Sequence, residues 1–126
     1  IRRLTRDLDI PVRIIAGATV REGDGLAMSS RNAYLSPAER AAAPVLNRVL
    51  RSIAARVRAG ETAAAALAWG SAELAAVGFA PIDYLDVRDG ETLEPLAAAA
   101  PAARIFAAAW LSRTRLIDNQ PVFPEA

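Results

Sequence analysis

The first twenty residues change from a helical to an extended hydrophobic pattern. Apolar residues recur at three- and four-residue spacing between charges over residues 1–8, which predicts an amphipathic helix. Asp9-Ile10-Pro11 interrupts that pattern, and the β-branched run at 12–17 predicts a short strand. A helix followed directly by a strand is typical of a parallel α/β sheet. We therefore expect residues 1–20 to be the closing unit of such a sheet, whose earlier strands are absent.

A long amphipathic helix is predicted from its end signals. Ser36, Pro37 and Glu39 stand at the cap, first and third positions of a capping box. The apolar face of this helix consists of Leu46, Val49, Leu50, Ile53 and Val57. Pro44 lies inside the helix and has no backbone N–H to donate, so we expect a kink or a break there.

A second, alanine-rich helix follows after Gly60. Thr62 is its expected cap, the helix runs to about Val77, and Gly78 ends it. Gly70 lies in its middle, where glycine costs about 1 kcal/mol relative to alanine. Its apolar face is thin, so this helix must depend on packing against the rest of the fold.

The remaining pattern predicts an antiparallel sheet. Residues 82–88 alternate apolar and polar side chains, 92–101 are irregular, and 104–111 are apolar enough for a central strand. A turn at 112–114 leads to a partner strand at 115–119, and the rest is expected to be a tail. The fold class is therefore α+β, with two helices packed on a small antiparallel sheet.

Composition narrows the chemistry that the chain can perform. The 126 residues contain 15 arginines and 14 acidic residues, with no Lys, His or Cys, and the formal net charge is +1. These absences exclude a disulfide scaffold, a thiolate metal site, a Schiff-base lysine and the usual histidine base. The net charge gives no case for a polyanion partner. The excess of alanine, 30 residues, and the uniform use of arginine are best explained by a GC-rich coding sequence.

No membrane or export segment is expected. No stretch approaches about 18 apolar residues without a charge or a proline. The basic residues at the start are not followed by the apolar core of a signal peptide. We expect a soluble, cytoplasmic and truncated chain.

Chemistry is concentrated in the segment between the predicted strand and the capping box. Ser29-Ser30-Arg31-Asn32 offers two hydroxyls, successive backbone N–H groups and one forked cation, a set that suits a polyphosphate. Asp24-Gly25 predicts a turn that lets the backbone approach a ligand closely. On composition alone the alternative stays open that these are ordinary turn formers and that Arg31 is a solvated loop charge.

A longer string makes this segment specific. Val20-Arg21-Glu22, then the run from Asp24 to Asn32 (DGLAMSSRN), then Tyr34-Leu35-Ser36-Pro37 strongly resembles the pantothenate synthetase (pantoate–β-alanine ligase) family. Residues 83–89 (DYLDVRD) and 114–119 (TRLIDN) resemble that family's carboxy-terminal strands, in the same order. The resemblance covers nearly the whole chain.

The resemblance implies an ATP-dependent ligase of the pantothenate and coenzyme A pathway. Such enzymes form a pantoyl adenylate from pantoate and ATP, release pyrophosphate, and let the amine of β-alanine displace AMP. It implies that Met28, Ser29, Ser30 and Arg31 contact ATP, that Ser29, Ser30 and Arg31 are the catalytic residues, and that the backbone of Val20 lies beside the adenine. It further implies Mg²⁺ as a cofactor, a cytoplasmic homodimer as the parent protein, and no membrane or nucleic-acid partner.

The chain departs from the family pattern in one informative respect. It contains no His, so the family's His-x-Gly-His signature is missing, together with the Lys and Gln residues of the first domain. We therefore interpret residues 1–20 as the remnant of a Rossmann-like nucleotidyl-transferase domain, and 21–126 as the carboxy-terminal α+β domain with an ATP-phosphate loop at 24–32. Pantoate and β-alanine would bind through the missing domain, so this chain alone is expected to be inactive.

Other polar and aromatic residues have simpler interpretations. Trp69 and Trp110 are expected to fill the core or an interface. Asp83 and Asp86 are expected on opposite faces of a strand, which argues against a metal site with Asp89. Arg113 and Arg115, beside a turn, are expected to be solvated or to contact the missing domain.

One alternative function remains open from the sequence. The chain could be a non-catalytic, arginine-rich module that binds a protein or a nucleic acid through the helix face around Arg48, Arg51 and Arg58. No aromatic residues are interleaved with these arginines, as stacking on bases would require. Affinity for a nucleic acid would fall steeply with salt between about 50 and 200 mM.

Overall fold

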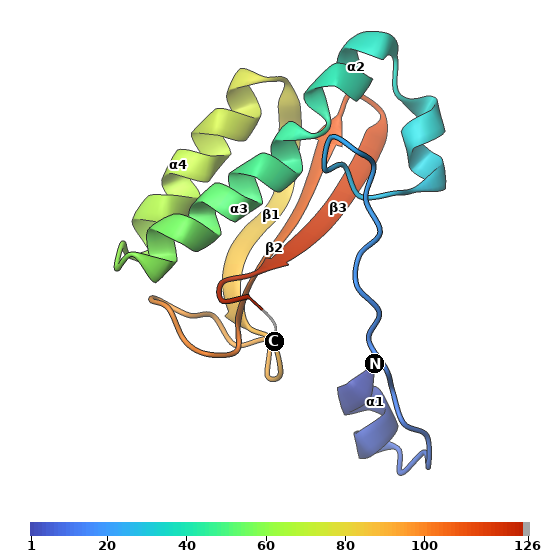
Figure 1. Ribbon diagram of the computed structural model, residues 1–126, viewed down its shortest axis with the longest axis vertical. Coiled ribbons are helices and arrows are strands. Elements are labelled where there is room, and N and C mark those ends of the chain that lie inside the picture. Colours follow the sequence, from blue (N-terminus) through green and yellow to red (C-terminus); the bar gives the residue numbers. More distant parts are fainter. Residues whose placement is uncertain (125–126) are drawn as a thin grey trace.

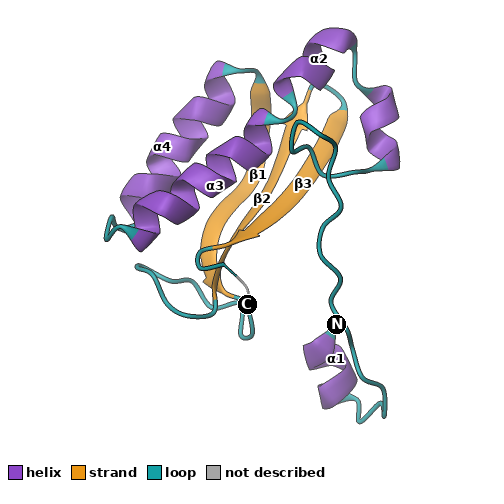
Figure 2. Cartoon of the chain, in the orientation of Figure 1, coloured by secondary structure: helices purple, strands orange, loops and turns teal. Residues whose placement is uncertain are grey.

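The computed structural model describes residues 1–124 as a layer of helices on one face of an antiparallel sheet (Figures 1 and 2). The sheet order is β1-β2-β3, so each strand is paired with its neighbour in sequence. The elements of the described residues are α1 (Arg2–Asp7), η1 (Ser30–Tyr34, a 3₁₀-helix), α2 (Pro37–Ala42), α3 (Val45–Arg58), α4 (Ala63–Ala76), β1 (Phe79–Asp89), β2 (Ala103–Leu111) and β3 (Thr114–Pro121). The predicted α+β class is confirmed.

The helix signals in the sequence are confirmed at their ends. The Ser36 hydroxyl accepts a hydrogen bond from the Glu39 backbone N–H, and the Glu39 carboxylate accepts one from the Ser36 backbone N–H. The predicted break occurs at Pro44, because α2 ends at Ala42 and α3 begins at Val45. The Thr62 hydroxyl caps α4 as expected.

The core lies between α3, α4 and one face of the sheet. Leu50, Ile53 and Val57 on α3 are fully buried, as is Ile105 on β2. Each such side chain stabilises the fold by about 1.5–3 kcal/mol through its removal from water. The alternate residues of β2 face the other way, where no helix of the described chain covers the sheet (Figure 1). We refer to this side as the open face.

The strand expected at 12–17 is not formed. Residues 12–17 are extended but pair with no strand among residues 1–124, and they are largely exposed. A parallel strand makes its backbone hydrogen bonds with neighbouring strands, and the described chain supplies none here. The helix expected before it is confirmed as α1, which buries no residue and is joined to the rest by an extended stretch (Figure 1).

The chain after the last strand is more ordered than the expected tail. Pro121 is the last residue of β3, and Val122 is fully buried. The Val122 backbone N–H donates to the Ala103 carbonyl, and its carbonyl accepts from the Arg58 guanidinium at 2.7 Å. The prediction was wrong because the prolines predicted an end to the strand at 119. Pro121 instead belongs to β3, and the backbone hydrogen bonding to β2 continues past it to Val122.

No helix among the described residues is both long enough and apolar enough to cross a lipid bilayer.

Candidate functional site

The predicted phosphate loop, 24–32, begins inside a tight hairpin, 20–28. Its backbone is closed by hydrogen bonds from Glu22 N–H to the Leu26 carbonyl at 2.8 Å and from Met28 N–H to the Val20 carbonyl at 3.0 Å. Gly25 at its tip has φ +92°, a conformation that side chains disfavour, so the predicted Asp24-Gly25 turn is confirmed. We refer to residues 20–28 as the hairpin.

The predicted phosphate loop continues from the hairpin into one short helix. Ser29 caps η1, and its hydroxyl oxygen accepts a hydrogen bond from the Arg31 backbone N–H at 3.2 Å. The Ser29 hydroxyl therefore keeps its own proton as a donor for a ligand. Ser30 and Arg31 are exposed on η1, and the side chain of Arg31 has no ion-pair partner within residues 1–124.

This loop forms one wall of a cavity of about 360 Å³, and α3 and the sheet form the other walls. Of the predicted site residues, Met28, Ser29 and Arg31 line the cavity together. Ser30 and Val20 do not line it, and Val20 is 68 % exposed on the hairpin. The structure therefore brings three of the five predicted residues to one cavity.

Arg115 on β3 lines the same cavity, whereas the sequence led us to expect it solvated or in contact with the missing domain. Its Nε donates to the Asp83 carboxylate at 2.6 Å, and its guanidinium lies 6.0 Å from the centre of the Tyr84 ring. The hydrogen bond to Asp83 raises the pKa of Arg115 above its usual value. Arg115 is therefore a second cation at the cavity in addition to the exposed Arg31, and unlike Arg31 it is held in an ion pair. The 114–119 string that contains it indicated a strand and gave no sign of a role at the cavity.

The placement of Asp83 corrects another expectation. Asp83 and Asp86 were expected on opposite faces of the strand, but a register irregularity between Ile82 and Tyr84 brings the Asp83 carboxylate to the open face. There it accepts hydrogen bonds from Trp110 and Arg115, and Asp86 on the same face pairs with Arg88. No group of three or more His, Cys, Asp or Glu residues within 1–124 is arranged to hold a metal ion.

Asn32 adds an acceptor to this cavity of donors. Its side-chain amide donates to the Ala27 carbonyl at 3.1 Å, which fixes the orientation of the amide. Its Oδ1 is buried and has no hydrogen-bond partner within the described residues. A buried acceptor without a donor is costly, so this oxygen is suited to a hydroxyl or amino group of a ligand.

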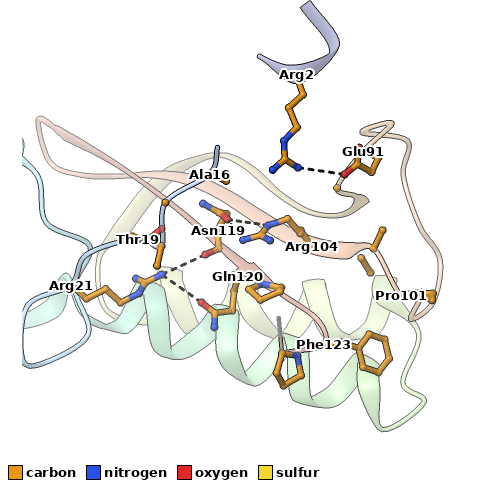
Figure 3. Close-up of a pocket in the computed structure, with 17 residues that line it drawn as sticks. Arg2, Ala16, Thr19, Arg21, Glu91, Pro101, Arg104, Asn119, Gln120 and Phe123 are labelled. Carbon is orange, nitrogen blue, oxygen red and sulfur yellow. Dashed lines mark hydrogen bonds and ion pairs between the residues drawn. The ribbon is translucent and has the colours of Figure 1, made fainter. Parts of the chain in front are cut away.

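A larger cavity of about 900 Å³ lies between the amino-terminal segment and the end of the sheet (Figure 3). Arg2 pairs with Glu91 at one side of it, and Arg104 donates to the Asn119 side chain at 2.8 Å. None of the five predicted site residues lines this cavity. The larger hollow adjoins the predicted phosphate site, with Thr19 and Asn119 lining both cavities.

Of the two tryptophans expected in the core or an interface, Trp69 packs against the core and Trp110 does not. The Arg56 guanidinium lies 4.7 Å from the centre of the Trp69 ring. Trp110 lies on the open face, and its indole N–H donates a hydrogen bond to the Asp83 carboxylate.

Comparison with known proteins identifies the family. The family model described as pantoate-beta-alanine ligase matches residues 1–121. A protein named pantothenate synthetase from Acidiphilium cryptum is 56 % identical over 122 residues, covering 97 % of this chain and 44 % of the relative. One of the same name from Rhodospirillum rubrum is 52 % identical over 120 residues, covering 94 % of this chain and 43 % of the relative.

Solved structures agree with this assignment. The crystal structure of pantothenate synthetase from Thermus thermophilus superposes with a TM-score of 0.88 at 46 % identity, covering 98 % of this chain and 45 % of that one. The chain has the fold and the sequence of one part of these ligases, and it spans less than half the length of the relatives that it matches. The chain belongs to the pantoate–β-alanine ligase family.

Proposed function

We propose that this chain is the ATP-phosphate-binding part of a ligase that condenses pantoate with β-alanine to give pantothenate, AMP and pyrophosphate. In this proposal residues 21–126 are its carboxy-terminal domain, with the phosphate loop at 24–32, and residues 1–20 end a Rossmann-like domain. The supporting observation is the convergence of Met28, Ser29 and Arg31 with Arg115 on one cavity, in a chain of this family.

The cavity has the polarity that a nucleotide requires. The Ser29 hydroxyl and the Arg31 and Arg115 guanidiniums are donors for phosphate oxygens, and permanently charged, forked guanidiniums suit that task. The partnerless Asn32 Oδ1 suits a hydroxyl or amino donor of the same ligand. Ser30 on the phosphates and the Val20 backbone beside adenine remain part of the proposal on the family resemblance. A ligase from Francisella tularensis, which shares this fold, was crystallised with beta-gamma ATP and beta-alanine.

The proposed chemistry is electrostatic. A carboxylate oxygen of pantoate attacks the α-phosphorus of ATP, and the bond from that phosphorus to the leaving pyrophosphate breaks. The attacking carboxylate is already ionised, so this step needs no base, which agrees with a cavity built without histidine. Arg31, with Ser29 and Ser30, stabilises the charge that develops on pyrophosphate. The amine of β-alanine then attacks the acyl carbon, and AMP leaves.

The described side chains that line this cavity do not supply ligands for Mg²⁺. The one carboxylate that lines it, among the described residues, is Asp118, and both of its oxygens already accept hydrogen bonds from protein groups. Mg²⁺ prefers carboxylate and phosphate oxygens. We therefore assign none of these side chains to the metal. The homodimeric state of the parent ligase remains a proposal from the resemblance.

The proposal is tested by Arg31→Ala in a complete ligase. We define the fusion enzyme as the part of A. cryptum pantothenate synthetase that precedes the matched region, joined to residues 1–126 of this chain. Removal of one donor to a developing anion lowers kcat by about 10²–10³-fold in other enzymes, and we expect a loss of that order. AMP release from ATP, pantoate and β-alanine measures it, and thermal unfolding should be unchanged because Arg31 is exposed.

Arg51→Ala is the matched control. Arg51 is an exposed arginine on α3 that does not line the cavity, so its loss should leave AMP release unchanged. Full activity of the Arg31→Ala fusion enzyme would show that Arg31 is not catalytic. The alternative, non-catalytic module predicts no AMP release from the fusion enzyme, and it predicts that Arg51→Ala weakens partner binding whereas Arg31→Ala does not. Arg58 of its proposed face already donates to the Val122 carbonyl.

A further inference from the structure

The strongest buried polar cluster outside the predicted site residues is centred on Asp118 of β3, whose side chain is 3 % exposed. Its Oδ2 accepts from Arg21 at 2.7 Å and from the Asn47 side chain at 3.2 Å. Its Oδ1 accepts from Arg21 at 2.9 Å and from the Asn119 backbone N–H at 2.7 Å. Both oxygens are therefore satisfied, and the carboxylate holds a guanidinium with two parallel hydrogen bonds.

Arg21 carries this bond into the hairpin. The same guanidinium donates to the Gly25 carbonyl at 3.1 Å, and it approaches the Asn119 carbonyl and the Gln120 side chain at 3.5 Å each (Figure 3). The Arg21 side chain thus connects Gly25, at the tip of the hairpin, to β3. Lysine has the charge but not the planar fork that these contacts require.

Beyond the hairpin, the loop is held by local hydrogen bonds and by the contact of η1 with β3. Met28, Ser29, Ser30 and Arg31 are exposed, and the hydrogen bonds of the loop are local, such as that between Asn32 and the Ala27 carbonyl. Arg21 is the bridge partner of Ala27, which directly precedes Met28. The position of Arg21 therefore sets where the phosphate loop leaves the hairpin.

Two other contacts hold the hairpin, and neither fixes its orientation relative to β3 as the Arg21–Asp118 pair does. Leu26 is buried, but an apolar contact is not directional. Asp24 pairs with Arg40 on α2 at 2.6 Å, but both side chains are about two-fifths exposed, and exposed pairs contribute little. The Arg21–Asp118 pair is the partly buried, bidentate attachment.

We propose that Arg21 and Asp118 are positioning residues that hold the phosphate loop at the cavity in the geometry needed for ATP. The inference rests on the proposed function of that loop. Neither residue needs to touch ATP, since both act through the hairpin on Ser29 and Arg31. Asn47 on α3 donates a hydrogen bond to Asp118 and lies beside Gly25, so it completes the site that receives the Arg21 guanidinium.

The test uses Arg21→Lys in the fusion enzyme, with Arg40→Gln as the control that breaks the exposed pair of the same hairpin. We expect Arg21→Lys to raise KM for ATP about tenfold or more, because a bidentate charge-assisted bond is lost, while KM for β-alanine stays unchanged. Arg40→Gln should leave both KM values unchanged. A merely structural role would instead lower the active fraction and leave KM for ATP as it was, and that result would overturn the proposal.

A second readout separates this inference from the proposed function. Amide hydrogen exchange should become faster at residues 28–32 in Arg21→Lys, while the amides of β2 keep their protection. Unchanged exchange at 28–32 overturns the positioning role even if the enzyme is active. Faster exchange in a fusion enzyme that makes no AMP even with the wild-type sequence supports the positioning role and rejects the ligase function. Asp118→Asn, which keeps the side-chain shape, replaces Arg21→Lys if that variant does not fold, with the same expectations.

Discussion

At the scale of single residues, Gly70 shows how packing reverses a local preference. A methyl group built on Gly70 would lie 2.6 Å from Ile53 Cδ1 and 3.1 Å from Val49 Cγ1. Both of those residues belong to the buried face of α3. Glycine is therefore used in α4 because it allows the two helices to approach closely, and this benefit exceeds its cost to the helix.

Gly70→Ala should accordingly destabilise the chain, although alanine is the better helix former. Forcing an extra carbon into a packed core costs about 1–3 kcal/mol, which exceeds the gain of about 1 kcal/mol in helix propensity. Urea unfolding followed by circular dichroism measures the difference. Ile53→Val removes the clashing Cδ1, so the double variant should be more stable than the sum of the two single changes predicts. Additive effects, or a stabilised Gly70→Ala, would contradict this account.

The residues that converge on the cavity were predictable only in part. Met28, Ser29 and Arg31 lie within four positions of one run that resembles the family's loop, although Ser30 of the same run does not line the cavity. Arg115 lies more than eighty positions away, and its place at the cavity depends on strand pairing and on Asp83. The Asp118 receptor for Arg21 was missed for the same reason, since no local pattern relates positions so far apart.

At the scale of elements, the open face of the sheet carries two ion pairs, Arg88–Asp86 and Arg115–Asp83. Asp83 accepts from the Trp110 N–H at 3.1 Å and from Arg115 at 2.6 Å. The hydrogen bond from Arg115, supported by that from Trp110, holds the pKa of the Asp83 carboxyl below its usual value, against a smaller opposing effect of burial. This carboxylate links all three strands of the described sheet.

The lowered pKa of Asp83 predicts a pH-dependent contribution to stability. The ionised carboxylate is favoured in the folded chain, so its contribution is complete above the ordinary aspartate pKa of about 3.9 and is lost as pH falls through the lowered value. Asp83→Asn should therefore be less stable than the wild type at pH 7, and the gap should close in acid. Urea unfolding at neutral and acidic pH measures it. Asp7→Asn, in an exposed pair on α1, is the charge-matched control; a gap that persists in strong acid would contradict the assignment.

The elements themselves were predictable in proportion to how local their signals are. Caps and breaks at Ser36, Pro44 and Thr62 depend on residues within one turn, and the structure confirms each of them. The strand at 12–17 failed because a strand depends on partners elsewhere, and none lies beside it within the described residues. The β-branched pattern of 12–17 therefore established an extended backbone and no more.

At the scale of the whole molecule, the chain is a helix-on-sheet body with an amino-terminal segment that buries little. Exposed apolar side chains are concentrated in that segment, including Ile1, Leu4, Leu8 and Ile15. The phosphate loop, by contrast, is attached to the body through the hairpin. In the proposed function the body supplies the donors for ATP, and the pantoate contacts come from residues outside this chain.

The isolated chain is therefore expected to show no turnover. Incubated with ATP, Mg²⁺, pantoate and β-alanine, it should release no AMP above background, because the proposal places the groups that orient the two other substrates outside this chain. The fusion enzyme, assayed in parallel by AMP release, should be active. Turnover by the purified chain at the rate of the fusion enzyme would show that the described cavity is a complete active site.

The two tryptophans lie on opposite sides of the sheet, and this gives the chain a built-in optical probe. Trp69 belongs to the helix layer, whereas Trp110 shares the Asp83 carboxylate with Arg115 at the wall of the cavity. Indole fluorescence responds to charges beside the ring, so in the proposed function we expect emission from Trp110 to change when Arg115 binds a phosphate. In a chain whose Trp69 is replaced by phenylalanine, a nucleotide titration becomes visible by intrinsic fluorescence alone, with no attached dye and no coupled assay.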